Sequence, residues 1–236
     1  MPNDDQVRIL ELGISAWNEW RQANPNVKPN LAEADLRGLD VARYDHNYFL
    51  EIDQARYEAE NEMRTSEWHT AEEEEIVVDD SYWPSDLPYG FDLNNADLTD
   101  ARLDGANFSG ASFARANLKY AHLDGADLSD SSFEGANLHH ASLQGVNLSF
   151  ANLTRANLIS VALDNANLFQ VRLDECVMTG AFMMSTVLAN NDLSKVIGMD
   201  QVSHYGPSRM LRPALPKLPK GGNANAEVLN HWSGVR

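Results

Sequence analysis

ANFSGASFARANLKYAHLDGADLSD, residues 106–130, is rich in small and polar residues, yet a Leu or Phe stands at every fifth position. These positions are Phe108, Phe113, Leu118, Leu123 and Leu128. Helices bury side chains with a period near 3.6 and strands with a period of 2, so a period of five matches neither pattern. The stretch therefore predicts a fold that buries one large apolar side chain in each group of five residues.

The five-residue pattern extends far beyond this stretch. From Leu93 to Leu193 every fifth residue is Leu, Phe or Met, at 21 positions without a miss. The residue two places before is small, usually Ala, and the residue directly before is often Asn or Asp. The two residues that follow favour Ser, Thr, Asp and Gly. Such a fixed internal period is typical of repeat proteins.

Two of every five residues must then face inward, and the polar pair must turn the chain before the next inward residue. A coil of short straight sides joined by turns meets both demands. Coils stacked about 4.8 Å apart let each backbone group pair with the coil above or below, as strands do in a sheet. The residues therefore predict a solenoid, and they leave the number of its sides open.

The repeat resembles the A(D/N)LXX signature of the pentapeptide-repeat family, without interruption over residues 91–195. That resemblance implies an all-β solenoid, a right-handed quadrilateral β-helix with four pentapeptides in each coil. Residues twenty apart would then stack, as in the series Leu98, Leu118, Leu138 and Leu158. The Leu and Phe side chains would fill the axis of the solenoid.

The flanking sequences predict a cap and an excursion. Leu10, Ile14 and Trp17 have the spacing of an amphipathic helix, which would cover the open end of the first coil. Leu31, Leu36 and Val41 show the same five-residue spacing before the main array, which predicts three sides of a first coil. The segments expected along the chain are an N-terminal capping α-helix at 1–25, a first partial coil at 26–43, an acidic insertion at 44–90, the β-helix at 91–198, and a C-terminal cap segment with a flexible tail at 199–236.

The formal net charge of −17 argues against direct binding of nucleic acid through its phosphates. Residues 44–90 carry fourteen acidic residues against two basic ones, so most of the acidity lies in the insertion. The candidate acidic surface consists of Glu72, Glu73, Glu74, Glu75, Asp79 and Asp80. A solvated helix end or a disordered loop is the alternative interpretation of this run.

The sequence contains no run of about 18 apolar residues, so no membrane span is expected. Its acidic start lacks the features of a secretory signal. The single cysteine, Cys176, excludes an intramolecular disulfide and fits a reducing compartment. We therefore predict a cytoplasmic protein. Cys176 occupies the small inward position of its repeat, where a buried and inert thiol is expected.

Motifs of catalysis and cofactor binding are missing from the sequence, which has no Gly-rich phosphate loop after a strand and no nucleophile elbow. His139 and His140 are adjacent on an outward corner, and His69 lies near Glu67 and Glu72. Neither set has the spacing of metal ligands. We predict a protein that is not an enzyme and that holds neither a metal nor a cofactor.

Outward positions become apolar towards the C-terminal end of the repeats. The candidate partner or dimer surface consists of Ile159, Phe169, Val177, Phe182, Met184 and Val187. Apolar side chains concentrated in this way need a cover. The chain's own residues 199–218 would provide one, and a homodimer through the C-terminal end or another protein would provide another.

These features favour a non-catalytic solenoid that acts as a protein-interaction scaffold for a partner whose identity the sequence does not give. The alternative, implied by the resemblance, is a DNA-mimicking regulator of a type II topoisomerase (gyrase), as some pentapeptide-repeat proteins are. A DNA mimic needs negative potential along the whole rod. Residues 91–195 carry twelve acidic residues against six basic ones, with Arg102, Arg115, Arg155 and Arg172 interspersed, so their charge is mixed.

Overall fold

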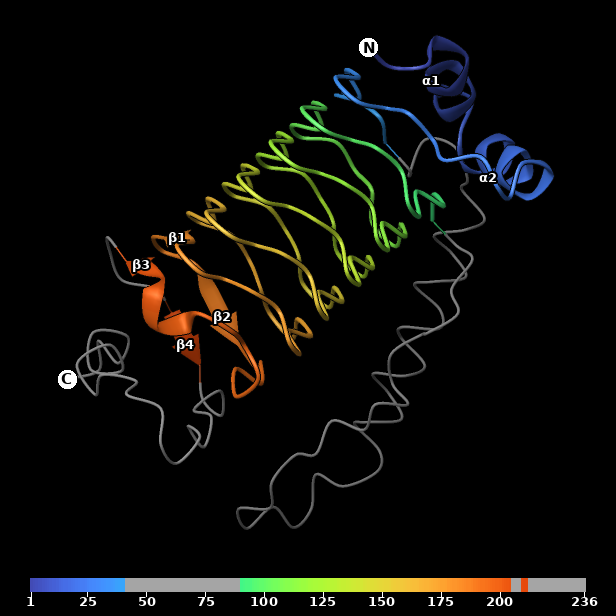
Figure 1. The fold of residues 1–236 in the computed structure, drawn as a ribbon. Helices are drawn as coiled ribbons and strands as arrows, with labels where there is room; N and C mark the ends of the chain where they lie inside the picture. Colours follow the sequence, from blue (N-terminus) through green and yellow to red (C-terminus); the bar gives the residue numbers. More distant parts are fainter. Residues whose placement is uncertain (41–89, 205–208, 212–236) are drawn as a thin grey trace, which may run out of the picture.

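The structure, a computed structural model, describes residues 1–40, 90–204 and 209–211 (Figure 1). Helices α1 (Asp4–Glu11) and α2 (Ile14–Ala23) stand at one end of a long stack of coils. The opposite end carries β1 (Phe182–Met183), β2 (Val187–Ala189), the 3₁₀ helix η3 (Met199–Gln201), β3 (Ser203–His204) and β4 (Arg209–Leu211).

Backbone pairing between residues twenty apart joins the coils. Asp97 pairs in parallel with Asn117, and Asn117 pairs with Asn137. The N–H of Leu98 donates to the carbonyl of Asn117 at 2.7 Å, and the N–H of Asn117 donates back to the carbonyl of Ala96 at 2.9 Å. The pattern recurs at every fifth residue, so each coil has four sides. The fold is the right-handed quadrilateral β-helix that the resemblance implies.

We number the sides by the inward residues of one coil. Side 1 contains Leu93, side 2 Leu98, side 3 Leu103 and side 4 Phe108, each with the residues stacked on it at intervals of twenty. All 21 Leu, Phe and Met residues of the series are buried, and so are the Ala residues two places before them. These side chains fill the axis as predicted.

Aromatic rings stack within the same core. The rings of Phe113 and Phe133, on side 1 of consecutive coils, are parallel with centroids 4.7 Å apart. Phe108 contacts Phe113 edge to face at 5.7 Å. Fully burying one Leu or Phe stabilises a fold by about 1.5–3 kcal/mol, so the regular series supplies the main apolar driving force.

On side 2, residues at the start of α1 form the hydrogen bonds that a preceding coil would otherwise form. In an inner coil, each outward residue donates its N–H to the preceding coil and accepts from that coil at its carbonyl. Asn30, in the first coil, donates instead to Oε1 of Gln6 at 2.8 Å, and its carbonyl accepts from the N–H of Asn3 at 2.9 Å. The start of α1 therefore satisfies the exposed edge of side 2.

Helix α2 performs the same task on side 1. The N–H of Asp92 donates to Oδ1 of Asn18 at 3.0 Å, and the carbonyl of Asp92 accepts from the indole N–H of Trp17 at 2.7 Å. The predicted capping helix is present, and the structure divides it at Gly13. Gly13 has a φ of 108°, a backbone conformation that only glycine adopts easily.

The first coil is assembled from two separate segments. Asn30, Asp35 and Asp40 pair with Asp97, Arg102 and Asn107, so residues 30–40 form sides 2, 3 and 4. Asp92 then supplies side 1. Gly90 precedes it, and a Cβ there would lie 2.3 Å from the carbonyl oxygen of Gly110. Val41 and nearly all of the predicted insertion lie outside the described residues, and we propose that the insertion leaves the coil at the corner between sides 4 and 1.

The C-terminal residues continue the winding with a longer spacing. Ile197 pairs with Val177 twenty residues earlier, whereas β3 pairs with β1 at a separation of twenty-one and β4 pairs with β2 at twenty-two. The residue added between Ile197 and Ser203 accommodates η3, and Gly198 before it has a left-handed φ of 79°. Val202 is buried and Met199 packs against the core, so this segment extends the core beyond the five-residue series.

We expect Leu138→Ala to lower the free energy of unfolding by about 2–5 kcal/mol, because a buried Leu leaves a cavity when it is truncated. Leu138→Asp should prevent folding, since an unpaired carboxylate would enter the axis. Urea unfolding followed by circular dichroism measures both effects. An aspartate variant with the wild-type melting temperature would contradict the five-residue register.

Candidate interaction surfaces

The predicted partner or dimer residues lie around three sides of the solenoid at its C-terminal end. We call them the apolar collar, which consists of Ile159, Phe169, Val177, Phe182, Met184 and Val187. Ile159 and Val177 belong to side 2, Phe182 and Met184 to side 3, and the remaining residues to side 4. Phe182 is 40% exposed and Met184 is 39% exposed, whereas the other members are half-buried.

The collar begins where ladders of asparagine side chains end. On side 2, Nδ2 of Asn157 donates to Oδ1 of Asn137 at 3.2 Å, and Nδ2 of Asn137 donates to Oδ1 of Asn117 at 3.3 Å. Val177 takes the next position in this ladder. Because valine can neither donate nor accept, its side chain offers only apolar surface at that position.

Side 4 repeats the arrangement. Nδ2 of Asn167 donates to Oδ1 of Asn147 at 3.1 Å, and Nδ2 of Asn147 donates to Oδ1 of Asp127 at 3.1 Å. Val187 then follows Asn167 on the next coil. The ladders on sides 2 and 4 therefore stop at the same level of the solenoid, and the apolar residues begin together.

Each ladder starts at an aspartate, because an ionised carboxylate accepts hydrogen bonds but cannot pass one on. On side 2, Asp97 accepts from Nδ2 of Asn117 at 3.2 Å and from Oγ1 of Thr99 at 2.7 Å. Burial of the Asp97 carboxylate favours its neutral form. The pKa of Asp97 is nevertheless lowered, because other interactions outweigh burial. These are the hydrogen bonds from the side chain and backbone of Thr99, the charge of nearby Lys28, and the hydrogen bond from Asn117.

Two further apolar residues belong beside the collar and were not predicted. Ile197, which pairs with Val177, is 53% exposed. The ring of Phe150 contacts that of Phe169 edge to face, with centroids 5.5 Å apart. Ile197 lies beyond the last inward Leu, so the five-residue series does not reach it, but its distance of twenty residues from Val177 could have identified it.

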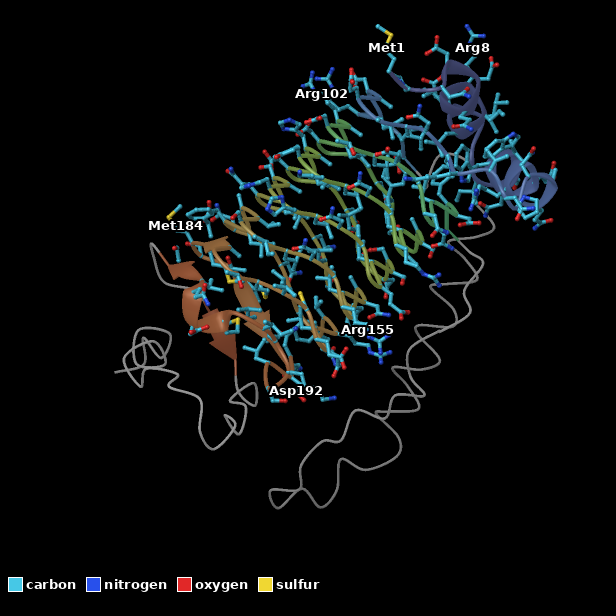
Figure 2. The ribbon with its side chains drawn as sticks, in the orientation of Figure 1. Met1, Arg8, Arg102, Arg155, Met184 and Asp192 are labelled. Atoms are coloured by element: carbon cyan, nitrogen blue, oxygen red, sulfur yellow. The ribbon has the colours of Figure 1, made fainter. Side chains whose placement is uncertain are left out.

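The chain's own C-terminal segment covers the backbone of the collar more than its side chains. β3 and β4 pair with the free edges of β1 and β2, which satisfies peptide groups there. Met184 nevertheless projects from the solenoid at the end opposite the helices (Figure 2). The collar is therefore a lateral surface and not the end of the stack.

The corner between sides 1 and 2 has a different character from the collar. Arg155 lies 3.5 Å from a carboxylate oxygen of Glu134 and 3.0 Å from one of Glu175, and Lys195 lies 2.7 Å from one of Asp174. These ion pairs join successive coils, and Figure 2 shows Arg155 at the edge of the solenoid. The apolar residues thus leave one side of the solenoid to charged groups.

The other sequence predictions have different outcomes. The candidate acidic surface, residues 72–75 with Asp79 and Asp80, lies outside the described residues and stays a prediction. Cys176 is buried as predicted, and burial raises the pKa of its thiol to about 12, which disfavours the reactive thiolate at neutral pH. Within the described ranges, no group of three or more His, Cys, Asp and Glu residues is arranged to hold a metal ion.

The helices of the described segments are also too short and too polar for a membrane span.

Comparison with known proteins supports the assignment of the repeat. The family described as Pentapeptide repeats (8 copies) matches residues 92–130 and 131–170. Among solved structures, the chain is similar to alr5209, a pentapeptide repeat protein from Nostoc PCC 7120, with 30% identity over 48% of this chain and 84% of that chain and a TM-score of 0.27.

Two further solved structures are similar to this chain. HetL, a pentapeptide repeat protein involved in heterocyst differentiation regulation from the cyanobacterium Nostoc sp. strain PCC 7120, is 19% identical over 81% of this chain and 78% of its own, with a TM-score of 0.43. Full-length QnrB1, a plasmid-mediated fluoroquinolone resistance protein, is 18% identical over 62% of this chain and 84% of its own, with a TM-score of 0.26. No significantly similar protein was found among curated sequences.

The lowered pKa of Asp97 predicts a specific acid sensitivity. Because the pKa of this carboxyl is lower in the folded than in the unfolded state, its stabilisation is complete above the unfolded pKa, about 3.9. It is lost as the pH falls through the folded pKa. Asp97→Asn should therefore lose less unfolding free energy than the wild type between pH 5 and pH 3, measured by urea titration. Asp100→Asn, at an exposed corner of the same coil, is the control. Equal pH dependence in the two variants would contradict a role for the Asp97 bonds.

Proposed function

This chain belongs to the pentapeptide repeat family, and from that premise we propose that it is a non-catalytic protein-interaction scaffold that binds through the apolar collar. The observation that carries the proposal is the exposure of Phe182 and Met184, at positions that earlier coils give to polar residues. Side 3 carries Ser142 where Phe182 stands, and Gln144 where Met184 stands. Apolar side chains exposed together on a rigid surface are typical of protein contacts.

The rigidity of the solenoid favours binding at this surface. The N–H of Phe182 donates to the carbonyl of Val161 in the coil before, the carbonyl of Phe182 accepts from the N–H of Leu163, and β1 pairs with β3 in the coil after. The backbone between Phe182 and Met184 therefore loses little conformational freedom when a partner binds. A second copy of the chain is one candidate partner, since a two-fold axis would bring the same collar together from both copies. Another protein is the alternative partner.

We expect the double substitution Phe182→Ser with Met184→Gln to abolish binding while the protein stays folded. Both replacements are residues that side 3 already uses at these positions, and the side chains are about 40% exposed, so the unfolding free energy should change by about 1 kcal/mol or less. Light scattering measures self-association, and co-purification of partners by the wild type and the variant is compared by mass spectrometry.

Ala162→Ser, on the same side one coil earlier, is the control. A wild-type protein that stays monomeric would contradict the homodimer. The same bound proteins in equal amounts on the wild type and the double variant would contradict the collar as the binding surface.

The alternative of a DNA mimic that regulates gyrase has less support. Several carboxylates of the solenoid are already engaged: Asp92 lies 3.3 Å from Arg21, and Asp174 lies 2.7 Å from Lys195. Oδ1 of Asp127 accepts from Ser129 and from Asn147. Carboxylates bound in this way present less negative potential than the free phosphates of a duplex.

We therefore expect purified protein to leave gyrase supercoiling unchanged at micromolar concentration, measured by the migration of relaxed plasmid on an agarose gel. Inhibition by the wild type that disappears after Asp92, Asp97, Asp127 and Asp174 are each changed to Asn would establish the mimic instead of the scaffold.

A further inference from the structure

The corner between sides 2 and 3 carries cationic and aromatic side chains where other coils have smaller groups. Lys119 and Tyr120 turn this corner in one coil, and His139 and His140 turn it in the next. His122 follows on side 3, where it pairs with Arg102 in the preceding coil. We call Lys119, Tyr120, His122, His139 and His140 the histidine corner.

The rings of the histidine corner are ordered against one another. Tyr120 and His140 stack nearly parallel, with centroids 5.5 Å apart and 5° between their planes. The rings of His139 and His140 are 4.1 Å apart. The ammonium of Lys119 lies 4.8 Å from the centre of the Tyr120 ring, a cation–π distance. Tyr120 is 42% exposed, and His122 and His140 are exposed as well.

The positive charge of Lys119 is not neutralised by a carboxylate of the described residues, unlike that of several arginines. Arg21, Arg37 and Arg155 each form an ion pair, whereas Lys119 forms none with any residue in the described segments. The pKa of His139 is lowered by burial and by the proximity of His140 and Lys119, which agrees with a crowd of cationic groups.

Carboxylates near the corner are mostly occupied. Asp97 accepts hydrogen bonds from Thr99 and Asn117, Asp104 lies 3.7 Å from Arg102, and Asp124 accepts from Ser142 and the N–H of Gln144. Asp100 is exposed, one coil before Tyr120. Among the described residues, a ligand with several carboxylates would therefore meet one competing free carboxylate and a group of donors without partners.

We propose that the histidine corner binds an acidic peptide segment of a partner protein. The ammonium of Lys119 and the imidazoles of His122, His139 and His140 would donate to its carboxylates, and the exposed ring of Tyr120 would contact its apolar atoms. The net charge of −17 opposes a nucleic acid, which brings one charge at every nucleotide, more strongly than a short peptide with a few carboxylates. This surface goes beyond the apolar collar, which it meets only at Ile159, twenty residues after His139.

The binding depends on pH in a defined direction. A carboxylate next to an imidazole favours the protonated form of the imidazole, so a bound acidic peptide and bound protons stabilise one another at this corner. Binding and protonation are therefore linked, and the affinity rises as the pH falls from 8 to 6. Over this range the peptide carboxylates stay ionised.

The experiment measures fluorescence anisotropy of a fluorescein-labelled peptide, AEEEEIVVDD, whose sequence is that of residues 71–80 of this chain. AQQQQIVVNN is the neutral control peptide. We expect tighter binding of the acidic peptide at pH 6 than at pH 8. Lys119→Gln combined with His140→Asn should weaken it at pH 6 by about fivefold or more, because each exposed charge pair contributes only a small factor. Asn suits position 140, where φ is 60°.

Arg155→Gln removes the same single positive charge as Lys119→Gln from the corner between sides 1 and 2, so it separates the local effect from net charge. Equal weakening by Arg155→Gln, or binding of the neutral peptide, would overturn the proposal. The proposal would also be overturned if the peptide bound only after Glu72–Glu75 of the protein were changed to Gln. That result would mean that the acidic residues of this chain occupy the corner in the wild type. The collar variant tests a separate surface, and its outcome is read independently.

Discussion

The whole structure depends on the pairing of each outward residue with the residue twenty positions before and after it. One side of a coil presents a single residue that donates and accepts between coils, as Asn117 does with Ala96 and Leu98. A side this short is not stable as an isolated strand, so the fold is stable only when many coils stack in one register. The inward Leu and Phe residues fix that register, because a shift by one residue would place an Asn or Asp in the axis.

The pairing also decides what the outward positions can do. An Asn there bonds to the Asn below and to the backbone at the next turn, as Asn137 does through Asn117 and the N–H of His139. Its polar groups are then used within the solenoid. A residue without amide groups, such as Val177 or Val187, ends the ladder and presents an apolar side chain at that position. On sides 2 and 4 the Asn ladder and the collar valines are therefore two uses of one position, and side-chain hydrogen bonds give way to apolar surface where one replaces the other.

The sequence predicted the repeating part of this fold well, because each inward Leu reports the same local environment. The buried thiol of Cys176 was predicted for the same reason. It did not predict the break between the helices at Gly13, nor the way Trp17 and Asn18 take the place of a coil, because those contacts join residues more than seventy positions apart. Ile197 was missed because the inward series ends at Leu193 and the next inward position, 198, is a glycine. The collar members were named from the sequence, but their exposure depends on which strands lie over them.

The two ends of the solenoid are closed by unlike means, and this agrees with the proposal that a partner binds at its sides. The side chains of Gln6 and Trp17, from the two helices, form hydrogen bonds with the exposed backbone edge of the first coil on sides 2 and 1. The C-terminal segment pairs with the backbone of the last coil on sides 2, 3 and 4. Free strand edges, which in other sheets recruit further strands, are thereby reduced at both ends. A partner must then recognise side chains and not backbone edges. Side chains that repeat once in each coil on a rigid surface are suited to such recognition, because their relative positions do not change when a partner binds.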